Sequence, residues 1–249
     1  MTPAKYISSI VFENNLNDRS YLHGLPVIKY LSKEKELSFS SSVTFLVGEN
    51  GTGKSTLLEA IALAYGFNPE GGSRNFRFST NDTHSELFKH ITLVKRGYAK
   101  DGFFLRAESL YNVATNIDDM DRQPAFAPPV IEGYGGVSLH NQSHGESFLS
   151  IVQNRFFGKG LYILDEPEAA LSPMRLLTLM ADISALVKKD SQFIIATHSP
   201  MLMALPDSEI LELSFEGIKK VDYKDTEHYR VTKQFLDDPQ RMLHYLLEE

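Results

Sequence analysis

Short apolar runs alternate with amphipathic stretches along the chain, and this alternation predicts a layered α/β domain. The predicted strands cover Ser42–Val47, Gly102–Arg106, Leu161–Asp165, Gln192–Thr197, and an antiparallel pair at Glu209–Leu213 and Ile218–Tyr223. Helices are predicted over Lys54–Tyr65 and Pro173–Lys189. The second helix is amphipathic because its apolar residues recur at helical spacing on one face.

Two polar stretches are predicted to lack regular structure. Asn68–His84 is rich in Gly, Asn, Ser and Thr, and we expect an exposed loop or lid there. Asn116–Gly136 holds three prolines and an acidic cluster, and we expect a mobile connection. Strands needed for one sheet lie on both sides of each stretch, so we expect a single domain over residues 1–249.

The segment GENGTGKST at Gly48–Thr56 matches the pattern G-x-x-x-x-G-K-[ST] and lies between a predicted strand and a predicted helix. Small residues let the backbone wrap around phosphate oxygens, and the helix N-terminus adds partial positive charge. We expect Lys54 to contact the β- and γ-phosphates and Ser55 to bind Mg²⁺. The alternative is a chance match at a glycine turn. The other residues expected to contact the nucleotide are Glu49, Asn50, Gly51, Thr52, Gly53 and Thr56.

Two further predicted strands end in residues suited to phosphate chemistry. LYILDEPE places Asp165 and Glu166 at a strand end, where Asp165 would hold Mg²⁺ and Glu166 would orient the attacking water. The alternative is an ordinary strand followed by an acidic turn, and Glu168 is assigned to the surface. QFIIATHSP places His198 at the same sheet edge, where its imidazole would donate to a γ-phosphate oxygen or to water. The alternative is a histidine that caps a strand or turn.

Composition narrows the class of protein. Hydrophobic content of 42% and charged content of 23% argue against wholesale disorder. The chain has no cysteine, which excludes disulfides, thiolate metal sites and cysteine nucleophiles, and fits a cytoplasmic location. No apolar run approaches the roughly 20 residues of a membrane-spanning helix, so we expect no direct membrane insertion. A net charge of −7 argues against coating nucleic acid through bulk charge.

The order of these motifs resembles the ATP-binding-cassette (ABC) superfamily. QSHGES at Gln142–Ser147 precedes the acidic strand end and is similar to the family signature, LSGGQ or LSxGE. Ser143, Gly145 and Glu146 match the signature, whereas Gln142 stands where leucine is usual. Taken alone, the segment reads as a polar helix cap. The resemblance implies that these three residues contact ATP bound to the opposite subunit, and that the signature lies far from its own phosphate loop.

The resemblance also implies a P-loop NTPase fold of the ABC type: a mixed, mostly parallel sheet flanked by helices, with a helical subdomain that carries the signature. We place this helical or lid insertion at about residues 107–158. FFLRAES occupies the place of the family's glutamine loop and offers Glu108, a candidate metal ligand. AALSP is similar to the dimer-contact loop, with Ser172 where an acid is common. Tyr21 is a candidate for adenine stacking, with a core or surface tyrosine as the alternative.

Together these features predict an ATPase with Lys54, Glu166 and His198 as catalytic residues, ATP and Mg²⁺ as cofactors, and an ATP-dependent homodimer. The chain looks like stand-alone ATPases related to the chromosome-maintenance and break-repair heads, including predicted ATPases of the AAA type. That likeness implies a role in DNA repair or defence and a protein or nucleic-acid partner. One alternative is an ATP-gated binding or scaffold module with little turnover. Another is an energising subunit of a membrane transporter.

Overall fold

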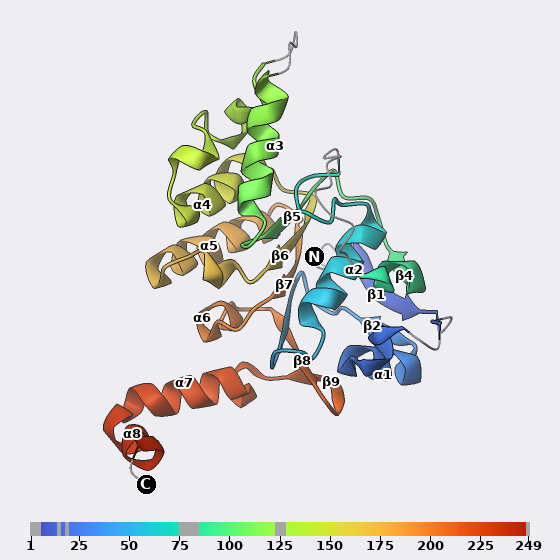
Figure 1. Cartoon of the computed structure of the whole chain (residues 1–249), viewed down its shortest axis with the longest axis vertical. Helices are drawn as coiled ribbons and strands as arrows, with labels where there is room; N and C mark the ends of the chain where they lie inside the picture. The colour runs from blue at the N-terminus through green and yellow to red at the C-terminus, as the bar shows by residue number, and fades with distance from the viewer. Residues whose placement is uncertain (1–5, 14–15, 18–19, 75–84, 123–127, 248–249) are drawn as a thin grey trace.

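A six-stranded sheet runs through the middle of the molecule, in the strand order β5-β6-β7-β3-β8-β9 (Figure 1). The structure is a computed structural model that describes residues 6–13, 16–17, 20–74, 85–122 and 128–247. The neighbouring strands are parallel except for the last pair, β8 and β9, which is antiparallel as predicted. The strands are β3 (Val43–Gly48), β5 (Asp101–Arg106), β6 (Gly160–Asp165), β7 (Gln192–Ala196), β8 (Glu209–Ser214) and β9 (Gly217–Val221). The predicted mixed, mostly parallel sheet is therefore confirmed.

The central strands are apolar throughout because helices or strands cover both faces of the sheet. Every residue of β3, β6 and β7 is buried. Successive side chains of a strand point to opposite faces, so Phe45 packs into one hydrophobic core and Leu46 into the other. This double burial is the physical reason why the strands read as continuous apolar runs in the sequence.

Different elements cover the two faces of the sheet. One face packs against α2 (Lys54–Tyr65), α1 (Pro26–Glu34) and a three-stranded antiparallel sheet of order β2-β1-β4. The strands of that sheet are β1 (Ile7–Phe12), β2 (Glu36–Ser38) and β4 (Ile91–Lys95). The other face packs against α3 (Leu110–Arg122), α4 (His144–Arg155), α5 (Pro173–Val187) and α6 (Pro200–Met203). Short 3₁₀ helices are η1 (Tyr21–Gly24), η2 (Glu86–His90), η3 (Val130–Tyr134), η4 (Leu139–Asn141), η5 (Pro167–Ala169) and η6 (Tyr223–Asp225).

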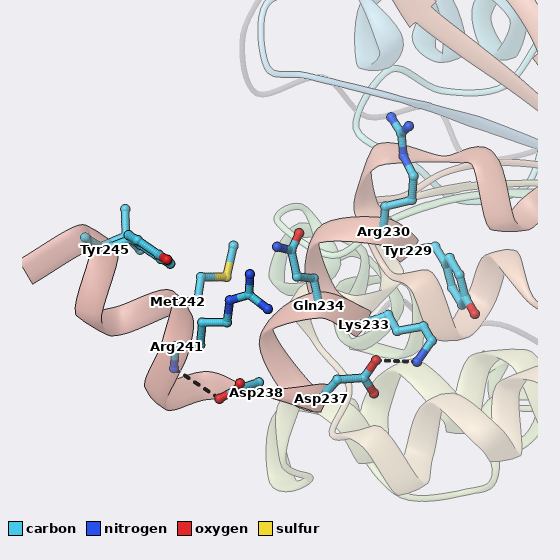
Figure 2. A pocket seen from close by; sticks show the side chains of 10 residues that line it. Tyr229, Arg230, Lys233, Gln234, Asp237, Asp238, Arg241, Met242 and Tyr245 are labelled. Carbon is cyan, nitrogen blue, oxygen red and sulfur yellow. Dashed lines mark hydrogen bonds and ion pairs between the residues drawn. The ribbon is translucent and has the colours of Figure 1, made fainter.

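Two C-terminal helices, α7 (Glu227–Asp237) and α8 (Pro239–Leu247), form an arm that extends from the end of the sheet formed by β8 and β9 (Figure 1). Neither helix contributes a buried residue. Figure 2 shows the hollow between them, and on its α7 side an ion pair joins Lys233 Nζ to Asp237 Oδ2 one turn along the same helix, at 2.5 Å. At the turn, Arg241 N donates to Asp238 Oδ1 at 3.1 Å and starts α8. Within the described part of the chain, no helix combines the length and apolar character needed to cross a bilayer.

The predicted mobile connection at Asn116–Gly136 is wrong for its first part, because α3 continues to Arg122. The helix is held by an apolar face, Leu110, Val113, Ala114 and Ile117, which packs into the core at helical spacing. Its acidic end is anchored as well, since the Asp121 carboxylate accepts the backbone N–H groups of residues 130 and 131. The expected loop at Asn68–His84 falls partly on residues 75–84, outside the described residues.

Candidate nucleotide site

The glycine-rich loop lies between β3 and α2, and close packing fixes its conformation. Gly48 has a φ of 134°, and a Cβ atom there would lie 2.0 Å from the carbonyl oxygen of Leu213. Gly53 has a φ of 97°, and its Cβ would lie 2.4 Å from Cγ1 of Val27. Only glycine fits both the backbone angles and the space at these positions. The loop therefore packs against β8 on one side and the start of α1 on the other.

Lys54, the first residue of α2, is only 5% exposed and bends back over the loop. Its Nζ donates to the carbonyl oxygens of Gly48 at 2.7 Å and Glu49 at 2.9 Å. Burial lowers the pKa of Lys54, and four nearby carboxylates, Glu166 first among them, oppose that shift. Thr52 Oγ1 also donates to the carbonyl oxygen of Glu49, at 2.9 Å. The ammonium group is thus held at the loop by acceptors that phosphate oxygens could replace.

Ser55 and Asp165 form a pair of oxygen ligands beside the loop. Ser55 Oγ donates to Asp165 Oδ1 at 3.2 Å, and Arg106 Nε lies 3.4 Å from Asp165 Oδ2. Burial raises the pKa of Asp165 to about 6, although Arg106 and the Ser55 hydrogen bond act in the opposite direction. The contact follows from strand register, because Arg106 and Asp165 pair directly at the ends of β5 and β6.

Arg106 was missed by sequence reading. It binds Glu59 on α2 at 2.9 Å and also pairs with Glu108. Glu108 itself is 73% exposed on its side chain and reaches Asp165 only through this arginine. Its expected role as a metal ligand stays a prediction. Arg106 meets Asp165 through the alignment of the two strand ends, which a single sequence does not reveal.

Glu166 follows Asp165 in a left-handed backbone conformation, with a φ of 46°. Such a conformation costs a non-glycine residue roughly 1–2 kcal/mol. It turns the chain at the sheet edge while Glu166 N still donates to the carbonyl oxygen of Ala196 on β7, at 3.0 Å. The Glu166 side chain then faces His198, with Oε1 3.7 Å from Nε2. Stored strain of this kind is typical of functional sites.

Glu168 is not a surface carboxylate, and its assignment to the surface is wrong. One oxygen accepts the Thr197 hydroxyl at 2.8 Å, and the other accepts the backbone N–H of His198 at 2.5 Å. The reason is local: Pro167 starts the 3₁₀ turn η5, which folds Glu168 back against the end of β7. Glu168 therefore fixes the backbone that carries His198.

His198 has a second neighbour that sequence reading missed. Its Nδ1 lies 3.0 Å from Nε2 of His228, near the start of α7. Burial lowers the pKa of His198, Lys54 lowers it further, and Glu166 opposes the shift. Together with Glu49 and Asn50 of the loop, the two histidines line an open groove of about 550 Å³. No motif marks His228, because α7 lies outside the phosphate loop and the strand ends that form the rest of the site.

These residues fit a magnesium-bound nucleotide. Serine hydroxyl and aspartate carboxylate oxygens are ligands that Mg²⁺ accepts, and Ser55 and Asp165 already lie within hydrogen-bonding distance. Arg106 Nε is buried beside them, 3.4 Å from Asp165 Oδ2, and makes no hydrogen bond within the described part of the chain. Glu49, Asn50 and Gly51 are exposed at the top of the loop. Oxygen ligands, a buried ammonium group and exposed loop backbone thus meet at the carboxyl edge of the sheet, where α/β proteins bind ligands.

Several known proteins are similar to this chain in sequence or in fold. One AAA-domain family model matches residues 19–123, and a second AAA-domain model, described with a Type IV TA system, matches residues 137–204. Among solved structures, cbiO1 from Clostridium perfringens, described as part of the ABC transporter complex cbiONQ, matches with a TM-score of 0.50 and 18% identity. The match covers 97% of this chain and 99% of that one. The chain has the fold of the ABC-type P-loop ATPases.

The predicted resemblance and fold class are thereby confirmed. A curated relative, the ribose import ATP-binding protein RbsA of Halalkalibacterium halodurans, is 24% identical over 229 residues, or 80% of this chain. The chain spans less than half of that relative, 44% of its length. The SMC head domain from Thermotoga maritima matches with a TM-score of 0.44 and 16% identity, over 88% of this chain and 100% of that one.

In this ABC-type domain the signature-like residues lie at the start of α4. Ser143 is the N-cap residue, and its backbone N–H and hydroxyl both donate to Glu146, at 2.9 and 2.6 Å. Arg175 on α5 donates to Ser143 and Glu146, and a Cβ on Gly145 would lie 2.8 Å from the carbonyl oxygen of Ala170. The helix-cap interpretation thus describes the local structure. Ser143 and Glu146 are exposed and remain accessible to a second molecule.

The structure brings Lys54, Ser55, Asp165, Glu166 and His198 to one edge of the sheet. Thr52 and Gly53 are the buried residues at the end of the loop, and Thr56 is half-buried on the first turn of α2. Tyr21 lies in η1 and is 65% exposed, and its stacking role stays a prediction.

Proposed function

We propose that this ABC-type domain binds ATP with Mg²⁺ at the phosphate loop and hydrolyses it, using Lys54, Glu166 and His198. One arrangement carries the proposal. A buried lysine lies over the glycine loop, the Ser55–Asp165 pair lies at 3.2 Å, and Glu166 lies 3.7 Å from His198. These are the groups that phosphoryl transfer to water requires: charge for the phosphates, oxygen ligands for a metal, and a base that orients water.

Each residue has a distinct role in this proposal. Lys54 exchanges its two carbonyl acceptors for oxygens of the β- and γ-phosphates. Ser55 and Asp165 hold Mg²⁺, with Glu108 as a further candidate ligand, and the bound metal supplies positive charge beside the phosphates. Glu166 accepts a hydrogen bond from the attacking water and orients it. His198 donates from Nε2 to the γ-phosphate and stabilises the charge that develops there.

The local charge balance supports a requirement for a divalent cation. Glu166, Asp165, Glu168 and Glu49 all lie close enough to Lys54 to raise its pKa. A triphosphate would add several negative charges to this carboxylate-rich edge. Lys54 and Arg106 together cannot offset them, so we expect nucleotide binding to depend strongly on Mg²⁺.

We further propose that ATP joins two copies of the chain. The start of α4 combines a helix N-terminus with the exposed Ser143 and Glu146 side chains, and a helix N-terminus attracts phosphate. Ser143, Gly145 and Glu146 of one copy would contact the γ-phosphate bound to the other. ATP then favours a closed dimer and hydrolysis favours its opening, because only the triphosphate makes contacts with both copies.

The test is the size of Glu166→Gln protein with and without Mg-ATP, measured by light scattering after gel filtration. The glutamine cannot act as a base, so bound ATP persists and we expect a dimer only with Mg-ATP. Glu216→Gln, an exposed carboxylate on the β8–β9 turn, is the matched control and should behave as wild type. A Glu166→Gln protein that binds ATP yet stays monomeric would overturn the sandwich. Equal phosphate release by wild type and Glu166→Gln would overturn the hydrolytic role and favour a scaffold module.

A second candidate function is that of an energising subunit of a membrane transporter. The names of two matched proteins, a ribose import ATP-binding protein and a part of the ABC transporter complex cbiONQ, favour it. Co-purification with a multispanning membrane protein tests it. The predicted role in DNA repair or defence is tested by adding DNA, which should then stimulate ATP turnover. A cytoplasmic location remains a prediction from the sequence.

A further inference from the structure

His228 is fixed against the strand tip that carries His198. It is the second residue of α7, and the preceding N-cap residue, Thr226, is fully buried. The Thr226 hydroxyl donates to the carbonyl oxygen of Tyr223 at 2.8 Å and accepts the backbone N–H of Tyr229 at 3.3 Å. These bonds lock the first turn of α7. His228 therefore has a defined position, with its ring centroid 5.2 Å from that of His198.

The neighbours of the two rings determine which nitrogens carry protons. His198 Nε2 faces an oxygen of Glu166 at 3.7 Å, and a carboxylate oxygen only accepts hydrogen bonds. His228 Nδ1 is buried and has no hydrogen-bond partner among the described residues, so a proton there would have no acceptor and a neutral His228 carries its proton on Nε2. This Nε2 lies 3.0 Å from His198 Nδ1, so His228 is the donor and His198 Nδ1 the acceptor. A neutral His198 then has its own proton on Nε2, on the side of Glu166.

The surrounding charges favour this neutral pair. Burial lowers the pKa of His228, and His198 and Lys54 lower it further, against Glu227 and Glu212. His198 faces Lys54 and Glu166. Two protonated rings in contact beside a lysine would repel one another, and a protonated His198 Nδ1 would leave two donors facing each other.

We propose that His228 is a positioning residue for hydrolysis: it donates from Nε2 to His198 Nδ1 and so keeps the Nε2–H of His198 directed at Glu166 and the γ-phosphate. This inference rests on the proposed function and adds a residue outside the phosphate loop and the strand ends. Without His228, the His198 ring can move its proton to Nδ1. Its bare Nε2 would then face the Glu166 carboxylate and the phosphate, which are both acceptors, and the stabilising hydrogen bond would be lost.

The kinetic test compares His228→Leu with His228→Gln. Leucine removes the donor at similar size, whereas the side-chain amide of glutamine offers a donor near the position of Nε2. Because one neutral hydrogen bond is worth about a three- to tenfold change, we expect His228→Leu to lower kcat about tenfold with KM for ATP within about twofold. We expect His228→Gln to recover most of the rate. Lys233→Gln, a change on the same helix at a residue that pairs with Asp237 and does not line this groove, is the matched control and should leave kcat unchanged. Circular dichroism and thermal unfolding check that each variant is folded.

A double variant shows whether His228 acts through His198. If it does, His198→Asn and the double variant His198→Asn/His228→Leu should have the same kcat, because the second change then removes nothing further. If the double variant instead lowers kcat by the product of the two single-variant factors, the proposal is overturned. A His228→Leu protein with wild-type kcat, or a His228→Gln protein as slow as His228→Leu, would also overturn it.

A spectroscopic readout needs no turnover. Nitrogen-15 shifts of the His198 ring in the nucleotide-free full chain should show a protonated Nε2 and a bare Nδ1 in wild type and His228→Gln. In His228→Leu we expect a mixture of both tautomers. An identical His198 spectrum in wild type and His228→Leu overturns the positioning role, even if ATP is hydrolysed. If the spectra are as expected but wild type does not hydrolyse ATP, the proposed function is contradicted and the positioning role of His228 is not.

Discussion

Replacing Glu168 with glutamine tests whether a carboxylate holds the two strand ends of the site together. In the structure its two oxygens accept one hydrogen bond each, from the Thr197 hydroxyl at 2.8 Å and the His198 N–H at 2.5 Å. Glutamine has nearly the same shape but only one acceptor oxygen. Its NH₂ group must therefore face one of the two donors, so one bond is lost and a donor–donor contact takes its place.

The size of the effect follows from the kind of bond. A hydrogen bond to a charged acceptor contributes about 1.5–3 kcal/mol to stability. Because Glu168 is only half-buried, we expect a value in the lower part of that range, about 2 kcal/mol. For a chain of this length, about 2 kcal/mol corresponds to a fall in Tm of roughly 4–8 °C. Displacement of the His198 backbone should also lower kcat about tenfold, since about 1.4 kcal/mol of transition-state stabilisation is a factor of ten.

The assays are differential scanning calorimetry and phosphate release at saturating Mg-ATP. Glu216→Gln is the control, because that side chain is 80% exposed and pairs with Lys219 on β9. Such a surface change should stay within about 0.5 kcal/mol of wild type. If Glu168→Gln unfolds at the wild-type temperature and hydrolyses ATP at the wild-type rate, the carboxylate does not position His198 and the reasoning fails.

Two further predictions concern the loop and the fold. Gly53→Ala should destabilise the domain by about 1–3 kcal/mol and weaken ATP binding, because the new Cβ would lie 2.4 Å from Cγ1 of Val27. The comparison variant is Gly51→Ala, whose Cβ would meet no atom within 4 Å, so that it carries only the cost of a φ of 81°. Calorimetry and nucleotide titration of the two variants check this difference. Asp101→Asn should lower the free energy of unfolding by about 3 kcal/mol at pH 7, because the Asp101 carboxylate, 11% exposed, pairs with Arg155 at 2.8 Å. Burial alone would raise the pKa of Asp101, but Arg155 and the hydrogen bonds to the carboxylate lower it below its usual value. The contribution is therefore complete above the unfolded pKa of about 3.9 and is lost as pH falls through the folded value, so urea titrations of wild type and Asp101→Asn should converge in strongly acidic buffer.

The parts of the fold that could be predicted depend on local patterns. The bounds of α2, Lys54–Tyr65, coincide with the prediction, because a buried strand, a glycine turn and a helical run follow one another without a gap. The end of α3 was missed because an acidic cluster and nearby prolines suggested a loop. Its four buried residues, Leu110 to Ile117, are sufficient to hold a helix against the core.

The parts of the site that could not be predicted depend on contacts between distant segments. Arg106 meets Asp165 because β5 and β6 align their ends, and strand register is not visible in a single sequence. Glu168 meets His198 because a 3₁₀ turn reverses the chain after Pro167, where the sequence suggests a surface. His228 meets His198 only because α7 starts beside β7's end, and no residue type or spacing announces that approach.

The phosphate loop and the residues that would act on water are held in place by different kinds of contact. The phosphate loop is held by its own backbone and by the packing of Gly48 and Gly53. The groups that would act on water are held instead by side chains from other elements: Glu168 fixes His198, and His228 orients its ring. Substitutions in the loop should therefore affect nucleotide binding first, whereas substitutions at Glu168 and His228 should leave binding nearly intact and lower turnover.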